Sequence, residues 1–456
     1  MKKQTEIKSY IELKSHLNEF VKFNMSYKGK PTLDRVQCFM TLLGNPQNKI
    51  KVIHVAGTSG KGSVCTFISQ LLTSQGLKVG LTISPHIYSV RERIQINGIP
   101  ITQNDFLNLY RYISPAIEKM KLTEFKSPSY FEILMAMAYV FFERNKVDVA
   151  VVETGLGGLL DASNASNSQD KFAVITKIGL DHQDVLGKTT SKIAVQKAGI
   201  IHRNNRVFLL KNKKNVNNVF IKVCEKKSAN YTFCDYKKVL KGIRLKDGHL
   251  EVNFFGKKTY IEKLQLSNCP KYQLQNLALS LMVVEEFINL RNLSLNISKL
   301  KEALLNFKIS ARFEIHKIKN KTVLFDGAHN PQKMRAFLAS LKERFKKTQF
   351  NFLVSFKKGK DYKNMTRSIS KLAKKIVFTD FSQIDQCTNI SSADPYLVKK
   401  EVDLLKISSN CEVVVNPDQA FKKMLSSTDS NIVVVTGSLY LVSHLLKNIG
   451  INKIDN

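Results

Sequence analysis

Short apolar runs alternate with segments of helical periodicity along the first half of the chain. Helices are predicted to begin at Ser63 and to cover residues 131–144 and 189–198, because apolar residues recur there every three or four positions. Strands alternating with helices indicate a mostly parallel sheet covered by helices. The buried strands are predicted at residues 51–56, 79–83, 147–153, 172–178 and 207–210.

A different pattern interrupts this alternation between residues 230 and 266. Apolar and polar residues alternate over short runs, as at 250–255 and 259–264, around turn signals at Asp247-Gly248 and Gly256. This pattern predicts a small antiparallel excursion at the edge of the first domain.

Two predicted helices, over 273–290 and 297–307, precede a second series of strands and helices that opens after Ser310. A helix is expected from Pro331 within this series. We therefore expect an α/β protein with a domain boundary near residues 308–312. The strands of the second series are predicted at 322–325, 350–355, 375–379, 411–415 and 432–436.

The first predicted strand runs into a glycine-rich segment, Gly57-Thr58-Ser59-Gly60-Lys61-Gly62-Ser63. Glycines let the backbone turn tightly against an anion, and the N-terminus of the following helix favours phosphate. In a P-loop of this kind, Lys61 reaches the β- and γ-phosphates and Ser63 places its hydroxyl on Mg²⁺. Gly62 separates the lysine from the serine, unlike the standard spacing, so a plain glycine-rich turn is the alternative.

Polar residues collect where predicted strands end. Glu153 ends one strand, Asp181-His182 follow the next, and Asp326 and His329 follow a strand of the second domain. Open α/β sheets bind ligands at this edge. A carboxylate and an imidazole beside Ser63 can form a Mg²⁺ site, although a lone Asp or His more often caps a helix or faces solvent.

Composition narrows the classes of partner. The 456 residues suggest two domains, and the net charge of +34 comes mostly from lysines spread along the whole chain. No arginine-rich or aromatic-interleaved module stands out, so we expect no nucleic-acid partner. The seven cysteines form no C-x-x-C pair, and no apolar run spans a bilayer, which predicts a cytoplasmic protein without a membrane partner.

Taken in order, the motifs resemble those of the folylpolyglutamate synthases and bifunctional dihydrofolate synthase/folylpolyglutamate synthases of the Mur ligase superfamily. The resemblance implies an ATP-binding, P-loop ATPase-type domain like the Mur ligase central domain over residues 1–308. A Rossmann-like α/β domain of Mur ligase type, the glutamate ligase domain, follows over residues 309–456. The matching segments are 33–47, 57–63, 84–94, 131–132, 153–164, 179–182, 197–200, 326–331 and 436–440.

The resemblance also implies an activity and small-molecule partners. A carboxylate of a folate takes the γ-phosphoryl group of ATP, and the amine of L-glutamate then displaces phosphate from the acyl phosphate to form an amide. The implied cofactors are ATP and Mg²⁺, and a monomer is expected, as is frequent in this family. The motifs leave open whether dihydropteroate is accepted as well as folates.

Residue roles follow from the same resemblance. The loop 57–63, Asn276, Arg312 and Asp326 would bind ATP, and Lys61, Lys197, Asp326 and His329 are the expected catalytic residues. Lys197 matches a lysine that the family carbamylates, and its carbamate would help to hold a second Mg²⁺. The implied Mg²⁺ ligands are Ser63, Ser84, Glu153 and His182, and the implied substrate-binding residues are Ser84, Pro85, His86, Arg91 and Asp161.

Some positions depart from the family pattern. Ser59 stands where Asn is usual, Leu159 replaces a basic residue, Tyr272 replaces a His and Gln196 replaces a Glu. These changes motivate a different interpretation, a non-catalytic relative that binds nucleotide or folate. A Mur-type ligase acting on a cell-wall nucleotide precursor is also compatible with the motifs, and the charge alone is compatible with a nucleic-acid-associated P-loop ATPase.

Overall fold

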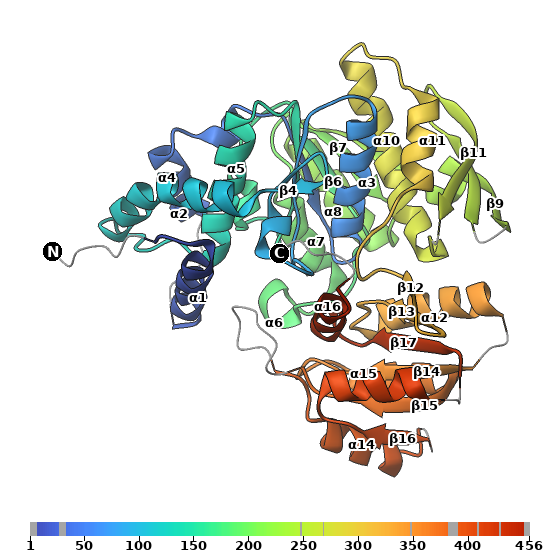
Figure 1. Cartoon of the computed structure of the whole chain (residues 1–456). Coiled ribbons are helices and arrows are strands. Elements are labelled where there is room, and N and C mark those ends of the chain that lie inside the picture. Colours follow the sequence, from blue (N-terminus) through green and yellow to red (C-terminus); the bar gives the residue numbers. More distant parts are fainter. Residues whose placement is uncertain are drawn as a thin grey trace.

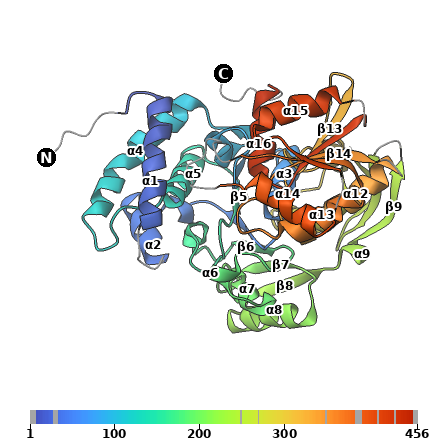
Figure 2. The ribbon, with the colours of Figure 1, turned by 90° about the horizontal axis from the view of Figure 1, so that it is seen from below.

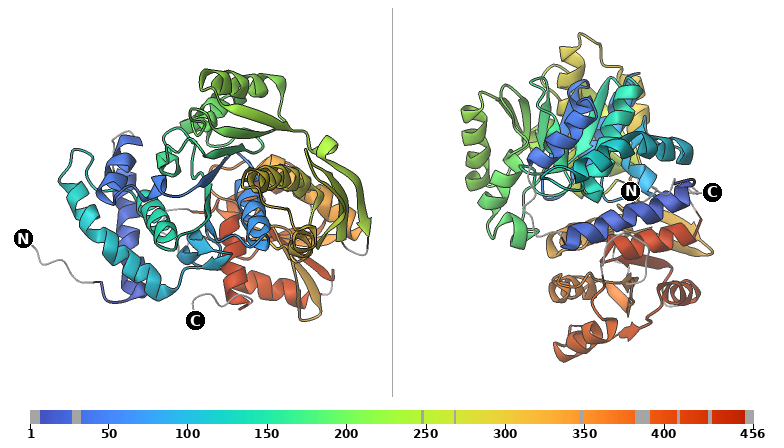
Figure 3. Two further views of the ribbon diagram at one scale, coloured as in Figure 1. Left: turned by 90° about the horizontal axis from the view of Figure 1, so that it is seen from above. Right: turned by 90° about the vertical axis from the view of Figure 1, so that its left-hand side faces the viewer.

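Two large sheets, each with its own helices, lie one above the other in the computed structural model of this chain, and a small third sheet accompanies the first (Figure 1). A view at a right angle shows the same two layers (Figure 3). The structure describes residues 7–26, 33–246, 249–267, 269–346, 349–381, 391–407, 410–427 and 430–450.

The first sheet has eight strands in the order β4-β3-β2-β5-β1-β6-β7-β8. All neighbours from β2 to β8 pair in parallel, whereas β3 and β4 extend the edge as antiparallel strands. The predicted parallel sheet is therefore confirmed. Its strands are β1 (Val52–Ala56), β2 (Val79–Thr82), β3 (Gln95–Ile96), β4 (Ile99–Pro100), β5 (Val149–Glu153), β6 (Phe172–Ile175), β7 (Arg206–Leu210) and β8 (Asn230–Cys234).

Helices cover both faces of this sheet, because successive side chains of a strand point to opposite faces. Ile53 of β1 packs in one core with α3 (Lys61–Ser74), α10 (Leu274–Leu290) and α11 (Ile297–Leu305), and Val52 packs in another. No described helix is both long and apolar enough to cross a membrane. The remaining helices of this body are α1 (Tyr10–Ser26), α2 (Leu33–Leu42), α4 (Gln103–Lys121), α5 (Tyr130–Arg144), α6 (Gln183–Leu186), α7 (Thr190–Ala198), α8 (Lys214–Lys226) and α9 (Tyr236–Val239).

The predicted antiparallel excursion is confirmed in part. Strands β9 (Leu240–Lys246), β10 (His249–Phe255) and β11 (Tyr260–Ser267) form a separate antiparallel sheet. Residues 230–234 were expected to belong to it, and this is wrong, since β8 pairs in parallel with β7 at the end of the main sheet. The expected turn at Asp247-Gly248 lies outside the described residues.

The second sheet has six strands in the order β12-β13-β17-β14-β15-β16, parallel except for β12. It confirms the α/β class, while the division into domains 1–308 and 309–456 remains our proposal. Its strands are β12 (Glu314–Ile318), β13 (Lys321–Phe325), β14 (Phe350–Val354), β15 (Ala373–Phe378), β16 (Cys411–Val413) and β17 (Ile432–Thr436). Its helices are α12 (Pro331–Phe345), α13 (Tyr362–Ser370), α14 (Pro395–Leu404), α15 (Pro417–Ser426) and α16 (Leu439–Asn448).

We call the first sheet, the small antiparallel sheet and their helices the first body, and the second sheet with its helices the second body. A loop of the first body enters the core of the second. Ile87 and Tyr88 are buried among apolar residues of the second sheet and of α16. Helix α16 lies at the boundary between the two bodies, the seam, in Figure 1, and Figure 2 shows the second body from below, in front of part of the first. The carboxylate of Glu92 accepts the backbone N–H groups of Ile87, Tyr88 and Ser89 at 2.9, 2.5 and 2.5 Å. Ser443 of α16 donates its hydroxyl to the Ile87 carbonyl. These contacts fix how the strand ends of the first sheet face those of the second sheet.

Candidate active site

A cavity of about 380 Å³ lies between the two bodies, where the strands β1, β5 and β6 end. It is the natural ligand position for an open parallel sheet. All residues expected to act in catalysis, ATP binding or metal binding line it, together with Pro85 of the predicted substrate-binding set. They are Gly57, Thr58, Ser59, Gly60, Lys61, Gly62, Ser63, Ser84, Pro85, Glu153, His182, Lys197, Asn276, Arg312, Asp326 and His329.

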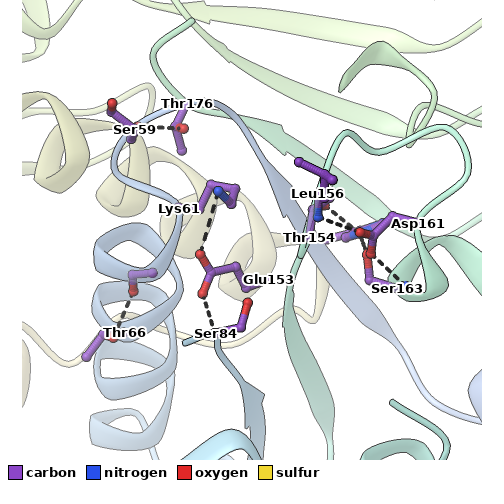
Figure 4. Close-up of polar contacts among 12 residues, drawn as sticks. Ser59, Lys61, Thr66, Ser84, Glu153, Thr154, Leu156, Asp161, Ser163 and Thr176 are labelled. Atoms are coloured by element: carbon purple, nitrogen blue, oxygen red, sulfur yellow. Dashed lines mark hydrogen bonds and ion pairs between the residues drawn. The ribbon is translucent and has the colours of Figure 1, made fainter. Parts of the chain in front are cut away.

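The glycine-rich loop takes a shape that two of its glycines make possible. Gly60 has a φ of +92°, and a Cβ there would lie 2.3 Å from Oδ1 of Asn276. At Gly57 a Cβ would lie 1.8 Å from Oγ1 of Thr176. The Thr176 hydroxyl donates to the carbonyl of Ser59 at 2.9 Å and so ties the loop to the end of β6 (Figure 4). The N–H groups of Thr58 and Ser59 donate to the carbonyl of Lys177 at 2.9 and 3.2 Å, so the loop amides left for a ligand are those at the start of α3.

Glu153 is the buried carboxylate at the end of β5 (Figure 4). Its Oε2 accepts the N–H of Ser84 at 2.8 Å, and its Oε1 lies 3.9 Å from Nζ of Lys61. Burial raises the pKa of Glu153, and the nearby ammonium of Lys61 opposes that shift. Its position beside the glycine-rich loop makes this carboxylate a candidate metal ligand.

Ser63 is linked to α10 through a chain of side-chain amides. Asn276 donates to Oε1 of Gln273 at 2.6 Å, and Gln273 donates to the Ser63 hydroxyl at 3.2 Å. The hydroxyl of Ser63 keeps a lone pair and its proton for a ligand. Gln273 was not among the predicted site residues, although it stands in the sequence three positions before Asn276, on the same helix face.

His182 begins α6 in a left-handed conformation, with a φ of 49°, beside Asp181. Burial lowers the pKa of His182, and Asp181 opposes this effect. Although burial raises the pKa of Asp181, the ion pair with Lys360 of the second body, at 3.2 Å, contributes to lowering it to about 2. The imidazole of His182 is therefore neutral and can offer a lone pair to a ligand at the cavity wall. The ion pair with Lys360 across the seam holds the neighbouring Asp181 in place.

Lys197 of α7 lines the cavity although only 4% of its surface is exposed. Burial, and after it the charge of Lys61, lowers the pKa of Lys197 to about 7. An amine with this pKa is partly neutral in neutral solution. It is therefore nucleophilic, which an ordinary surface lysine is not.

Asp326 stands at the end of β13 and joins the two bodies. Its Oδ2 accepts the hydroxyl of Tyr272 at 2.7 Å and the N–H of Phe313 at 3.0 Å, and its Oδ1 accepts the N–H of Ala328 at 2.9 Å. Burial raises the pKa of Asp326, and the guanidinium of Arg312 opposes that shift. Tyr272, a departure from the family pattern, is thus a structural contact of this site.

His329 and Lys333 form a pair of nitrogen bases on the second-body side of the cavity. Nδ1 of His329 lies 2.9 Å from the carbonyl of Gly327, and its Nε2 lies 3.0 Å from Nζ of Lys333. Lys333 was not among the predicted site residues. One signal for it was present in the sequence: a lysine in the first turn of a helix marked by Asn330-Pro331, where the helix dipole disfavours a cation.

Three predicted substrate-binding residues lie outside the cavity lining. The imidazole of His86 accepts from Arg93 at 3.0 Å, and Arg91 donates to the carbonyl of Ile101 at 2.9 Å. Asp161 accepts the N–H of Leu156 at 2.6 Å, and so shapes the glycine-rich turn that lines the cavity (Figure 4). Their contact with substrate stays a prediction, and the structure gives each of them an internal partner.

The donor set fits Mg²⁺ better than a transition metal. Among the described residues, no group of three or more His, Cys, Asp or Glu side chains is arranged to hold a metal ion. Mg²⁺ needs no such cage, since it is commonly bound by one or two carboxylates together with water and substrate phosphates. Glu153 with the hydroxyl of Ser63 beside the P-loop satisfies that requirement.

Basic side chains outnumber acidic ones along the cavity. Lys61, Lys177, Lys197, Arg312 and Lys333 line it, against Glu153, Asp181 and Asp326, although burial lowers the pKa of Lys197 and of Lys333 to about 7. An anionic ligand would favour the charged form of both lysines, because an opposite charge nearby stabilises an ammonium. The cavity therefore suits an anionic small molecule.

A parallel sheet with a P-loop at its edge, joined across a cavity to a second α/β sheet, defines a Mur-type ligase. The model of the Mur ligase middle domain matches residues 55–284, and the model of the dihydrofolate synthetase C-terminal domain matches residues 310–448. The chain belongs to the family of dihydrofolate synthases and folylpolyglutamate synthases.

Individual relatives agree over nearly the full length. The dihydrofolate synthase/folylpolyglutamate synthase of Bacillus subtilis is 32% identical and covers 97% of this chain and 99% of its own. The dihydrofolate synthetase of Saccharomyces cerevisiae is 29% identical over 91% of this chain and 97% of its own.

The fold is likewise similar to solved structures of folylpolyglutamate synthases. That of Mycobacterium tuberculosis, complexed with ADP and AMPPCP, has a TM-score of 0.87 at 26% identity, covering 97% of this chain and 99% of that one. That of Thermotoga maritima has a TM-score of 0.82 at 30% identity, covering 98% of each chain.

Proposed function

We propose that this chain is an ATP-dependent ligase that joins L-glutamate to a folate through an acyl phosphate. The observation that carries the proposal is the convergence of basic and acidic residues from both sheets on one cavity. A carboxylate is a poor electrophile at neutral pH, so phosphorylation must give it a leaving group. The named relatives act in folate metabolism, and one solved neighbour is complexed with ADP and AMPPCP.

The glycine-rich loop would bind the nucleotide. The amides at the start of α3 and the ammonium of Lys61 would hold the phosphates, with Asn276 and Arg312 as further contacts. Catalysis of phosphoryl transfer is mainly positioning and neutralisation of charge. Asp326 would act through Arg312 and through the backbone it fixes, since three donors already occupy its oxygens.

Mg²⁺ would be held by Glu153 and Ser63, with Ser84 and His182 completing the set proposed from the family. A metal ion held by these residues would supply neutralisation of the phosphate charge. Glu153 contributes the negative charge, while Ser63 and His182 contribute neutral donors. Gly62 keeps the approach open, because a Cβ at that position would lie 3.3 Å from Oε2 of Glu153.

Lys197 is proposed to carry a carbamate. Its neutral amine attacks CO₂, a C–N bond forms and one proton leaves, so the side chain becomes an anion. The low pKa of Lys197, about 7, makes the neutral amine available for this step. The resulting carboxylate would lie in the cavity beside Lys61 and would help to hold a second Mg²⁺.

The first test is phosphate release by the purified protein with ATP, Mg²⁺ and L-glutamate. Dihydropteroate, tetrahydrofolate and no acceptor are compared, and products are weighed by mass spectrometry. Release with both acceptors, each product heavier by one glutamate, would establish a bifunctional enzyme, and release with tetrahydrofolate alone a dedicated polyglutamate synthase. Silence with both would overturn the proposal in favour of a non-catalytic binding protein or another acceptor.

Replacement of the metal-site carboxylate is expected to change the Mg²⁺ requirement. In Glu153→Gln the carboxylate charge is lost while shape is kept, so half-maximal activity should need at least about ten times more Mg²⁺. Glu118→Gln, an exposed carboxylate on α4, is the matched control. Identical Mg²⁺ titrations of the two variants would remove Glu153 from the metal site.

The remaining partner assignments stay predictions. A cytoplasmic monomer without a nucleic-acid partner is what composition and the family suggest. Lack of retention on nucleic acid at physiological salt would test the last point, because non-specific binding by basic proteins weakens steeply with salt.

A further inference from the structure

The first turn of α12 brings a second nitrogen base to the cavity beside His329. Asn330 caps this helix by accepting the N–H of Lys333 at 2.8 Å, which places Lys333 in the opening turn. The side chain of Lys333 lines the cavity and reaches Nε2 of His329 at 3.0 Å. Neither the nucleotide contacts nor the metal set described above uses it.

The hydrogen bonds of His329 fix where the protons lie. The carbonyl of Gly327 can only accept, so Nδ1 of His329, 2.9 Å away, carries the hydrogen. In the neutral ring, Nε2 then presents a lone pair, and Lys333 must donate to it. One N–H of Lys333 is engaged in this way. The lone pair that a neutral Lys333 amine carries is left for a ligand in the cavity.

The surroundings disfavour an ammonium at Lys333. Burial has the largest effect and lowers its pKa to about 7, and the charges of Arg312, Lys61 and Lys360 act in the same direction. The carboxylate of Asp181 opposes them. The N-terminus of α12 adds its positive dipole end. Burial and then Lys333 also lower the pKa of His329, so neither base of the pair readily holds a full charge.

The proposed ligation needs a base at one step. L-glutamate arrives in water with a protonated amine, which has no lone pair and cannot attack an acyl phosphate. Resting on the proposed function, we propose that Lys333 is the general base that removes this proton, with His329 as the residue that orients it. General bases act best when they are poised between their two protonation states at the working pH.

The step balances in protons and bonds. The ammonium of glutamate gives one proton to the amine of Lys333, which becomes an ammonium hydrogen-bonded to Nε2 of His329. The neutral glutamate amine attacks the acyl carbon, a C–N bond forms, and the C–O bond to phosphate breaks. The second amine proton leaves with the inorganic phosphate, and Lys333 returns its proton to solvent when the product departs.

A second nucleophile distinguishes the role of Lys333 as a general base from a role as a positive charge that binds anions. Hydroxylamine is already neutral at neutral pH, so it traps an acyl phosphate as a hydroxamate without a base. The comparison uses the full chain and the variants Lys333→Met and Lys333→Arg. Lys342→Met, an exposed lysine in the last turn of the same helix, is the matched control. ATP, Mg²⁺ and the folate acceptor are the same in every assay.

With glutamate, Lys333→Met should lower kcat by about 100-fold or more, the usual contribution of a general base. With hydroxylamine, its rate should stay within about threefold of wild type. Lys333→Arg keeps a positive charge but cannot accept a proton, so it should resemble Lys333→Met. In wild type, the glutamate rate should fall as the pH drops through about 7, whereas the hydroxamate rate should not show this step.

Four outcomes would overturn the inference. Normal glutamate turnover by Lys333→Arg would show that only charge is needed, as for anion binding. Equal losses with both nucleophiles would place Lys333 in acyl phosphate formation or in folding, and no loss with either would leave it no role. A wild-type protein that forms neither product would overturn the proposed function itself, and this inference with it.

Discussion

Lys171 has no exposed surface, and its ammonium lies inside the first body among neutral polar groups. Its Nζ is 3.3 Å from the carbonyl of Ser166, 3.5 Å from Oδ1 of Asn164 and 3.2 Å from Nδ1 of His202. Burial lowers the pKa of Lys171 from 10.5 to about 7. The folded protein therefore binds this proton more weakly than the unfolded chain does.

The stability of the protein should consequently depend on pH through this residue. Since the unfolded chain binds more protons, stability rises with pH between about 7 and 10.5, by up to about 1.4 kcal/mol per pH unit. Lys171→Met lacks this slope. Urea unfolding of both proteins at about pH 7 and about pH 9 measures the difference. A gap between wild type and variant that does not change with pH would contradict the prediction.

At the scale of residues, the motifs predicted those site residues that a short stretch of sequence is enough to identify. Lys61 and Ser63 follow glycines after a strand, and Glu153 and Asp326 end strands, so their convergence was predictable. Lys333 could not be identified in this way, because its role depends on burial and on the tautomer of His329. Both are set by residues distant in the sequence.

At the scale of elements, the start of α3 depends on a close contact with α10. Gly60 has a positive φ, and its Cα lies against Asn276, which in turn holds Gln273 and Ser63 in place. The glycine therefore matters for two reasons, its backbone conformation and the space for the Asn276 amide. Only the need for space beside the Asn276 amide is specific to the glycine-rich loop.

A pair of substitutions separates these two reasons. Gly60→Ala and Gly76→Ala, with φ of +92° and +88°, should each lose about 1 kcal/mol of stability from backbone strain. A Cβ at Gly76 meets nothing within 4 Å, so the KM of the Gly76→Ala variant for ATP should match that of wild type. In Gly60→Ala the KM for ATP should rise at least about tenfold because Asn276 is displaced. Equal KM values would contradict the proposed role of the contact.

The central strands were predicted well, whereas the amphipathic helices α4, α8 and α13 and several strands at the edges of the sheets were not. The central strands β1, β5 and β6 are continuous apolar runs because helices cover both faces. β8 was assigned to the wrong sheet, since its exposed residues 230–232 carry a pattern like that of the antiparallel strands that follow. β12 was not predicted, because all five of its residues are at least partly exposed and give no clear apolar face.

At the scale of the whole molecule, polar contacts across the seam hold the two bodies in register. Tyr272 donates to Asp326 at 2.7 Å, and Lys360 pairs with Asp181 at 3.2 Å. Both contacts border the cavity, so the arrangement of the bodies and the shape of the site are coupled. The second sheet was predicted from the sequence, whereas the way it meets the first was not.

Loss of one seam contact should lower thermal stability. Tyr272→Phe removes a hydrogen bond to a buried carboxylate, a loss of about 1.5–3 kcal/mol, and each kcal/mol lowers the melting temperature of a large domain by roughly 2–4 °C. Tyr396→Phe, an exposed tyrosine on α14, is the control. Equal melting temperatures for the two variants would show that the Tyr272–Asp326 bond contributes nothing to the union of the bodies.

The loop that carries Ile87 and Tyr88 limits how this architecture can be recombined. Its two apolar side chains complete the core of a sheet that begins more than two hundred positions later in the chain. A chimera that exchanges only residues 309–456 between two homologues would join a foreign core to an unmatched loop. Residues 84–92 must therefore be transplanted together with this C-terminal segment, and in evolution the two segments are constrained to change together.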